Sequence, residues 1–213
     1  MSVSSDRVRR AWPLGNGTVL RERIVAAYEQ PWRRYHDVRH LDEVLARIAE
    51  ICSATTISAE QEEIVTLAGY FHDVVYRPDP SDGISNEEQS ARLAEAWLSS
   101  AGLDPDVVTE VARLVRGTQT HDSAPQDVAA HVLYDADLGI LAADPDRYAQ
   151  YVRDVRAEYA EVPDQQFAQG RSAVLEFLLR RPAVFATPYG RDRWEAAARD
   201  NVEQELLLLR AQT

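Results

Sequence analysis

Hydrophobic residues recur at helical spacing along almost the whole chain. In a stretch that begins near Val38, one face carries Val44, Leu45, Ile48 and Ile51, as in a helix packed on a core. No stretch shows the strict alternation of apolar and polar residues that is typical of a strand, so we predict an all-α fold. A second such face carries Ile64, Leu67, Ala68 and Phe71. Further helices are predicted over residues 18–29, 86–101, 105–117, 126–142, 145–160, 164–181 and 190–210.

Capping signals mark the starts of several of these helices. Ser58 followed by Gln61 has the spacing of a capping box, and Asp104 precedes a proline in the order favoured at a helix start. The loops are short, and we find no internal repeat or domain linker. We therefore expect one helical domain over residues 17–213, preceded by a loosely held segment over residues 1–16.

Composition narrows the classes of function. The 213 residues carry a net charge of −12, which argues against a nucleic-acid partner because such binding needs a basic surface. All 23 residues counted as lysine or arginine are arginine, so chemistry that needs a lysine amine is excluded. No apolar run reaches the roughly 18 residues of a membrane span, and no apolar signal region follows the polar first residues. With Cys52 as the single cysteine, we expect a cytoplasmic protein without a membrane partner.

The dipeptide His-Asp occurs three times, although the chain has only five histidines. His72 follows the apolar residue Phe71 at the end of a predicted helix and is expected to point inward. Asp73 beside it is costly to bury unless it is paired or bound to a cation. His40 lies at the edge of the apolar face of the helix that begins near Val38. Two imidazoles and a carboxylate suit Zn, Mn, Fe, Co or Ni better than Ca.

A fourth ligand is available in the segment LYDADLGIL, which offers Asp135 and Asp137. Side chains two residues apart on a helix point about 200° apart, so only one of them can readily face a given site. Asp137 has Leu133 four residues before it and Leu141 four residues after it, which indicates the more apolar and more buried side. We therefore prefer Asp137 as the ligand. The residues alone leave open whether any metal is bound.

Several segments together resemble the HD superfamily of metal-dependent phosphohydrolases, and more specifically a bacterial family of small predicted HD-domain hydrolases. They are RRYHDVRHL, AGYFHDVVYRP followed by SNEEQSA, TQTH, YDADLGIL, YAQYVRDVRAEY, GRSAVLEFLLRRPAVFAT and EAAARDNVEQEL, and together they cover about residues 17–210. The resemblance implies a single-domain helical bundle with a central site for one divalent ion (Mn, Fe, Co, Ni, Zn or Mg). It assigns the metal ligands to His40, His72, Asp73 and Asp137.

The resemblance also implies a reaction, in which metal-activated water hydrolyses a phosphate ester of a nucleotide or related small metabolite. A bound ion lowers the pKa of water from about 15.7 to roughly 7, and Asp73 is then both a ligand and a catalytic residue. Because the two carboxylates offset the charge of the ion, other cations are needed for the substrate. The nearest candidates are Arg33, Arg34, His36 and His121, and we also count the two histidines as catalytic candidates.

Glu87 is a further catalytic candidate, in the first turn of the helix that follows the HD pair. Some HD nucleotidases carry a water-orienting glutamate nearer to that pair, at a position where this chain has Tyr76. Glu87 is expected to take that role from further along the chain. The departure argues against activity on simple nucleoside monophosphates.

Two other functions suit the same residues. A di-iron oxygenase of the HD type needs about two more ligands, which His36, His121 and Glu87 can partly supply. A regulatory module that binds a nucleotide or a metal without turnover is compatible with the acidic composition. The apolar run at 206–209 is expected either to close the core or to form a contact in a homodimer.

Overall fold

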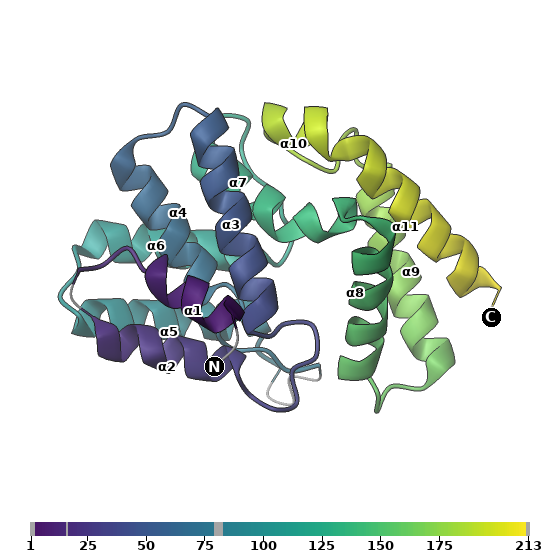
Figure 1. Ribbon diagram of the computed structural model, residues 1–213, viewed down its shortest axis with the longest axis horizontal. Helices are drawn as coiled ribbons and strands as arrows, with labels where there is room; N and C mark the ends of the chain where they lie inside the picture. The colour runs from purple at the N-terminus through teal and green to yellow at the C-terminus, as the bar shows by residue number, and fades with distance from the viewer. Residues whose placement is uncertain (1–2, 16, 79–82, 212–213) are drawn as a thin grey trace.

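The computed structural model describes residues 3–15, 17–78 and 83–211. Within these ranges the chain forms helices and no strand, so the predicted all-α fold is confirmed. None of the described helices has the length and apolar character that a membrane crossing requires. The elements, in chain order (Figure 1), are α1 (Val3–Arg10), α2 (Thr18–Tyr28), α3 (Val38–Ala54), α4 (Ala59–Phe71), α5 (Asn86–Ser100), α6 (Pro105–Gly117), α7 (Val128–Leu138), the 3-10 helix η1 (Gly139–Ala142), α8 (Pro145–Glu158), α9 (Asp164–Arg180), α10 (Pro188–Arg193) and α11 (Glu195–Arg210).

The helix starts follow the capping chemistry of the sequence. The Ser58 side chain accepts a hydrogen bond from the backbone N–H of Gln61, whose own side chain completes the capping box of α4. Asp104 caps α6 with a proline at its first turn, as predicted. The aspartate of the first His-Asp pair, Asp37, caps α3 by accepting from the backbone N–H groups of Arg39 and His40. Its carboxylate is therefore used to start the helix that carries His40.

Two of the predicted helices are interrupted. The stretch 126–142 becomes α7 followed by η1, with the change at Gly139, where an added Cβ would lie 2.5 Å from Cδ of Arg47. The stretch 190–210 becomes α10 and α11, which meet at Trp194. The hydrophobic periodicity continues across both breaks, so it gave no sign of them.

The expectation of a loosely held N-terminal segment is wrong for the described residues 3–10, which form α1 against α3. Val8 is fully buried, and its carbonyl accepts a hydrogen bond from the hydroxyl of Tyr70. Arg7 also forms an ion pair with Asp42 of α3. The polar sequence of this segment concealed these inward contacts. Residues 1–2 and 16 of the predicted segment lie outside the described residues.

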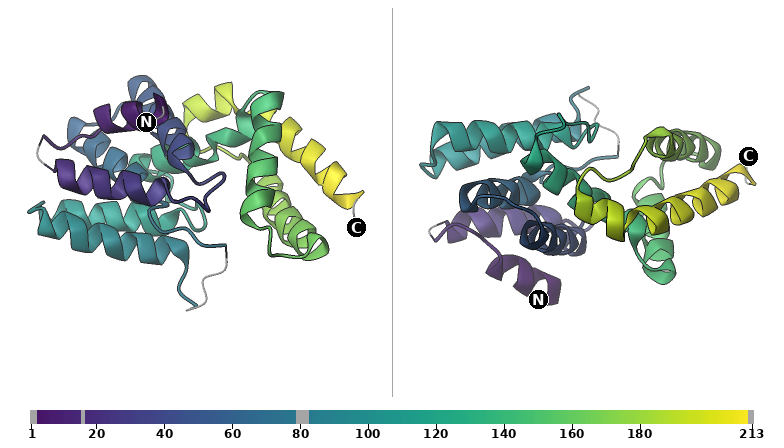
Figure 2. Two further views of the ribbon diagram at one scale, coloured as in Figure 1. Left: turned by 60° about the horizontal axis from the view of Figure 1, so that its bottom comes forward. Right: turned by 90° about the horizontal axis from the view of Figure 1, so that it is seen from above.

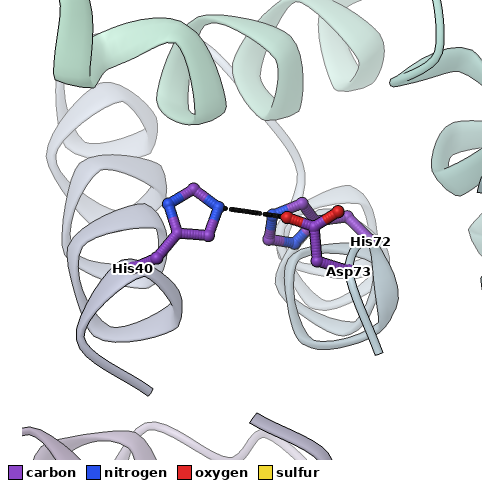
Figure 3. A group of neighbouring side chains, drawn as sticks. All are labelled: His40, His72 and Asp73. Atoms are coloured by element: carbon purple, nitrogen blue, oxygen red, sulfur yellow. Dashed lines mark hydrogen bonds and ion pairs between the residues drawn. The ribbon is translucent and has the colours of Figure 1, made fainter. Parts of the chain in front are cut away.

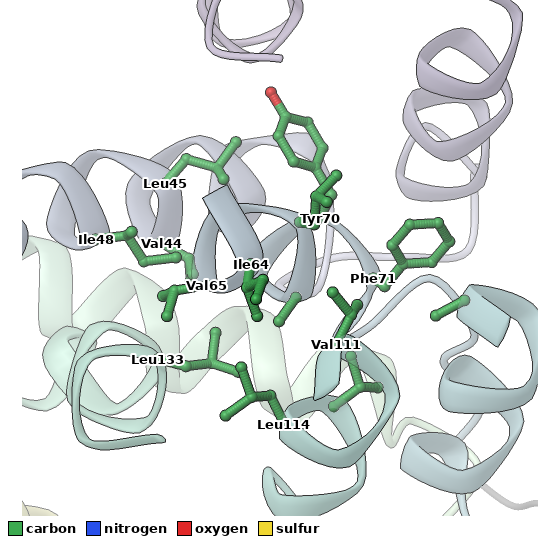
Figure 4. Close-up of a cluster of buried hydrophobic side chains, with 14 of the residues drawn as sticks. Val44, Leu45, Ile48, Ile64, Val65, Tyr70, Phe71, Val111, Leu114 and Leu133 are labelled. Carbon is green, nitrogen blue, oxygen red and sulfur yellow. The ribbon is translucent and has the colours of Figure 1, made fainter. Parts of the chain in front are cut away.

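The helices form two adjoining groups, each with its own hydrophobic cluster. The larger cluster is built from α1 to α7, and Figure 4 shows its centre, where side chains of α3, α4, α6 and α7 meet. The second cluster joins η1, α8, α9 and α11 with Tyr35 from the loop before α3. Trp194 packs against both clusters. Figures 1 and 2 show the two groups side by side, with α7 and η1 running between them.

The apolar run near the C-terminus divides its side chains between the core and the surface. Leu206 and Leu209 are buried in the second cluster, which confirms core closure for these two residues. Leu207 and Leu208 are each 66% exposed. A contact between two copies of the chain through the exposed pair stays a prediction.

Candidate metal centre

Three side chains from two helix ends point toward one another in the interior (Figure 3). His40 lies in the first turn of α3, His72 caps the C-terminus of α4, and Asp73 follows it. Nε2 of His40 lies 2.9 Å from Nε2 of His72. Oδ2 of Asp73 lies 3.3 Å from Nε2 of His40 and 3.2 Å from Nε2 of His72. These three residues form a group that could hold a metal ion.

Asp137, in the last turn of α7, adds a second carboxylate to this group. Its Oδ1 lies 3.4 Å from Nε2 of His40 and 3.8 Å from Nε2 of His72. Its Oδ2 lies 2.9 Å from Nε2 of His121. The four side chains proposed as ligands thus meet, and His121 holds the outer oxygen of one of them.

Asp135, the alternative to Asp137, has a different role. It is only 1% exposed, and it accepts hydrogen bonds from the backbone N–H groups of Ala186 and Thr187 and from the Thr187 hydroxyl. Burial raises the pKa of Asp135, although these donors partly offset that effect. The side chain of Asp137 is 17% exposed, so the argument that Asp137 is the more buried of the two was wrong. The two side chains do face different ways, as predicted: Asp137 faces the histidines and Asp135 faces Thr187.

The donor set suits a divalent ion that is intermediate between hard and soft. With metal–ligand distances of about 2.0–2.2 Å, neighbouring donors lie roughly 2.8–3.6 Å apart, and four of the five separations above fall in that range. Nδ1 of His72 lies 2.7 Å from the carbonyl of Gly69, which leaves Nε2 with a lone pair directed at the group. Two imidazole lone pairs cannot face each other at this distance without a proton or a cation between them. The residues therefore fit a metal ion, with two nitrogen and two carboxylate donors.

The electrostatics of the group favour a bound cation. Burial by itself would raise the pKa of Asp73, but the neighbouring His72 and His36 hold it well below its ordinary value. Burial lowers the pKa of His40. Burial also opposes protonation of His72, yet the carboxylates of Asp73 and Asp137 raise its pKa to about 9. The same carboxylates that favour a proton on His72 would favour a divalent ion at this point.

His36 lies beside this group and is held by a residue that the sequence reasoning missed. Its Nδ1 lies 2.6 Å from Oε2 of Glu158, and its Nε2 lies 4.0 Å from Oδ2 of Asp73. Oε1 of Glu158 accepts hydrogen bonds from the backbone N–H groups of Arg34, Tyr35 and His36, each 2.9 Å long. Glu158 ends α8, where a carboxylate opposes the helix dipole. That unfavourable position was the one signal in the sequence that could have drawn attention to it.

Tyr76, the departure from the nucleotidase pattern, forms one wall beside His36. The two rings are stacked, with centroids 3.7 Å apart and planes inclined by 19°. The Tyr76 hydroxyl lies 3.2 Å from the hydroxyl of Tyr159. Tyr76 therefore fixes the face of the His36 ring, while Glu158 fixes its edge.

The two arginines proposed as substrate contacts have different surroundings. Arg33 is only 5% exposed, and its guanidinium donates to the backbone carbonyls of His36, Asp73 and Val74 at 2.7–2.9 Å. It binds the two loops of the site together and is not available to a substrate, so that prediction is wrong. Arg34 is exposed. Its role as a substrate contact stays a prediction.

The remaining candidates are Glu87 and His121. Glu87 lies in the first turn of α5, and among the described residues no hydrogen bond or ion pair joins it to the metal group. His121 has the positive φ of 53° that non-glycine residues adopt uncommonly. Its Nε2 is occupied by Asp137, so in this geometry it positions a ligand.

The site is thus assembled from the start of α3, the end of α4, the end of α7 and the end of α8. Tyr35, a member of the second cluster, lies beside His40 here with ring centroids 4.8 Å apart, so the site lies where the two groups of helices adjoin. Comparison of the chain with protein-family models, with curated proteins and with solved structures gives no match.

Proposed function

We propose that this protein is a metal-dependent phosphohydrolase of the HD type that cleaves a phosphate ester of a small molecule. The observation that carries the proposal is the meeting of His40, His72, Asp73 and Asp137 around one point, with His36 4.0 Å away from Asp73. A divalent cation held by these four residues would act as a Lewis acid that acidifies water and offsets the charge of a phosphate.

The residues around the group supply the proton transfers. Asp73 contacts three histidines through Oδ2, which leaves Oδ1 to accept a proton from the attacking water. The water oxygen forms a bond to phosphorus as the ester P–O bond breaks. The released alcohol oxygen takes its proton from Nε2 of His36, whose other nitrogen is fixed by Glu158. The products are the free alcohol and phosphate.

The described residues favour a site for one metal ion over a site for two. The described residues give one group of three or more His, Cys, Asp or Glu side chains with ligand geometry. His36 and His121, which a di-iron centre would need, are engaged by Glu158 and Asp137. We therefore favour hydrolysis over the di-iron oxygenase.

The test compares phosphate release by the wild type with that of two asparagine variants. The protein is loaded separately with Mn²⁺, Fe²⁺, Co²⁺, Ni²⁺, Zn²⁺ or Mg²⁺ and given a panel of nucleotides and other phosphate esters. Asp73→Asn should lower the rate by on the order of 10²-fold or more. Asp122→Asn is the matched control, because Asp122 belongs to another His-Asp pair but is exposed and pairs with Arg181. Equal rates in the wild type and Asp73→Asn, or no release with any metal, would refute the proposal.

A further inference from the structure

A cavity of about 470 Å³ lies between α8 and α9, directly beside the metal centre. Its volume falls in the range of about 300–1,000 Å³ that is typical of small-molecule sites. Tyr35 and His36 line it, and both also touch the metal centre: the ring of Tyr35 is 4.8 Å from that of His40, and Nε2 of His36 is 4.0 Å from Asp73. Figure 1 shows α8 and α9 running side by side in the second group of helices.

The walls of this cavity are largely aromatic. Five aromatic side chains line it, from the loops beside the metal centre and from α8 and α9: Tyr35, Tyr76, Tyr151, Tyr159 and Phe167. Several of their rings already meet in tilted or edge-to-face pairs, such as Tyr35 with Tyr151 at 4.6 Å between centroids and Tyr159 with Phe167 at 5.9 Å. Rings of this kind offer both apolar area and favourable packing geometry to another aromatic group.

The basic side chains in the wall are already paired with carboxylates. Arg171 donates to Oε1 of Glu205 at 2.7 Å and to the hydroxyl of Tyr151 at 2.7 Å. His36 is paired with Glu158. Among the described residues that line the cavity, these are the only basic side chains, so none is left unpaired for a second phosphate.

We propose that the cavity receives the uncharged aromatic part of the substrate, so that the preferred substrate is an aryl phosphate monoester. This inference rests on the proposed function, because it places the single phosphate at the metal centre. His36 lies at the boundary between the centre and the cavity, next to the ester oxygen that joins the two parts of such a molecule. The proton donor and the aromatic pocket thus serve the same leaving group.

Gly170 offers a way to fill the cavity without disturbing the fold. It lines the cavity from α9, and a Cβ added there would meet no atom within 4 Å. Gly170→Phe places a ring in the space, whereas Gly170→Ala is a matched control that adds only a methyl group and favours the helix. Neither variant changes a residue of the metal centre, and circular dichroism checks that both remain folded.

Binding is measured by titration calorimetry with three phosphonates, which cannot be hydrolysed: 2-naphthylphosphonate, octylphosphonate and methylphosphonate. Metal-loaded wild type should bind the naphthyl compound at least about tenfold more tightly than the other two, because the ring buries apolar area. Gly170→Phe should remove that preference and leave methylphosphonate binding unchanged, and Gly170→Ala should behave as the wild type.

Several results would overturn the inference. They are equal affinity for the three compounds, tighter binding of the octyl compound, no binding of any of them, or an unchanged naphthyl preference in Gly170→Phe. The proposed function fails in a different way. Naphthyl binding without hydrolysis of 2-naphthyl phosphate would refute the hydrolase while supporting the cavity assignment. Hydrolysis of phosphate esters without an aromatic preference would support the hydrolase and refute the cavity assignment.

Discussion

Nδ1 of His36 lies 2.6 Å from Oε2 of Glu158, 122 residues away in the sequence. This contact joins the loop before α3 to the last residue of α8, and hence the first group of helices to the second. The other oxygen of Glu158 accepts three consecutive backbone N–H groups, so the carboxylate shapes the loop as well as holding the imidazole. We regard Glu158 as a positioning residue for His36.

Glu158→Gln should lower the free energy of unfolding by about 1.5–3 kcal/mol at pH 7, because a charged acceptor is lost. The histidine and backbone donors hold the pKa of Glu158 below its ordinary 4.5 even though burial opposes this. A lowered pKa stabilises the fold fully above the unfolded value, and that stability is lost as the pH falls through the folded value. The difference between wild type and variant, measured by urea unfolding, should therefore shrink below about pH 4.5.

The control for this prediction is Glu161→Gln, which changes an exposed carboxylate three residues further along the chain. It should leave stability within about 0.5 kcal/mol of the wild type. A difference between wild type and Glu158→Gln that does not change between pH 7 and pH 3 would contradict the role given to the carboxylate.

Tyr76 should matter for turnover through its ring and not through its hydroxyl. Tyr76→Phe keeps the stacking on His36, whereas Tyr76→Leu removes it. Stacking contributes about 0.5–1.5 kcal/mol, so the leucine variant should lower kcat by up to about tenfold with an unchanged metal content. Steady-state phosphate release together with elemental analysis checks this. Equal kcat values for the leucine and phenylalanine variants would show that the ring does not position His36.

The two aspartates of YDADL should separate metal binding from stability. Asp137→Asn should reduce metal affinity, because it removes a ligand carboxylate next to both histidines. Asp135→Asn should retain the ion but lower the free energy of unfolding by about 1.5–3 kcal/mol, because its carboxylate accepts three hydrogen bonds in the interior. Calorimetric titration measures the metal affinity of both variants, and urea unfolding measures their free energy of unfolding. Loss of the ion in Asp135→Asn together with full metal affinity in Asp137→Asn would contradict the roles assigned to the two carboxylates.

Arg33 should be required for stability, whereas Arg34 should not. Replacing Arg33 by Met leaves the carbonyls of His36, Asp73 and Val74 without their donor, and each unpaired buried group costs about 1–3 kcal/mol. Arg34→Met changes an exposed side chain and should leave the unfolding midpoint almost unchanged. Thermal unfolding of the pair tests this, and similar midpoints for the two variants would show that Arg33 does not join the loops.

The helices could be predicted because the sequence signals that specify each one lie within the helix itself or next to it. Hydrophobic spacing and side-chain caps act within one or two turns, so α5 and α6 begin and end within one residue of the predicted limits. The direction in which a helical side chain points is also a local property, so it could be inferred that Asp135 and Asp137 face different ways. The helix α1 could not be inferred, because its single deeply buried aliphatic residue, Val8, gives no periodic pattern.

Contacts between distant segments could not be predicted in this way. Nothing near Arg33 in the sequence shows that its guanidinium turns inward to carbonyls of residues 73 and 74. Likewise, Glu158 and His36 meet only because the second group of helices packs beside the first. The same packing creates the cavity between α8 and α9, which brings together aromatic side chains from distant parts of the sequence.

Whether His40, His72, Asp73 and Asp137 bind a metal ion is tested most directly by the metal content of the purified protein. It is measured by elemental analysis after incubation with each of the six divalent metals and removal of unbound ions. We expect about one ion per chain in the wild type and in Asp122→Asn, and a clear loss in variants of His72, Asp73 or Asp137. A wild type that retains none of the six metals, or variants that retain as much as the wild type, would contradict this expectation.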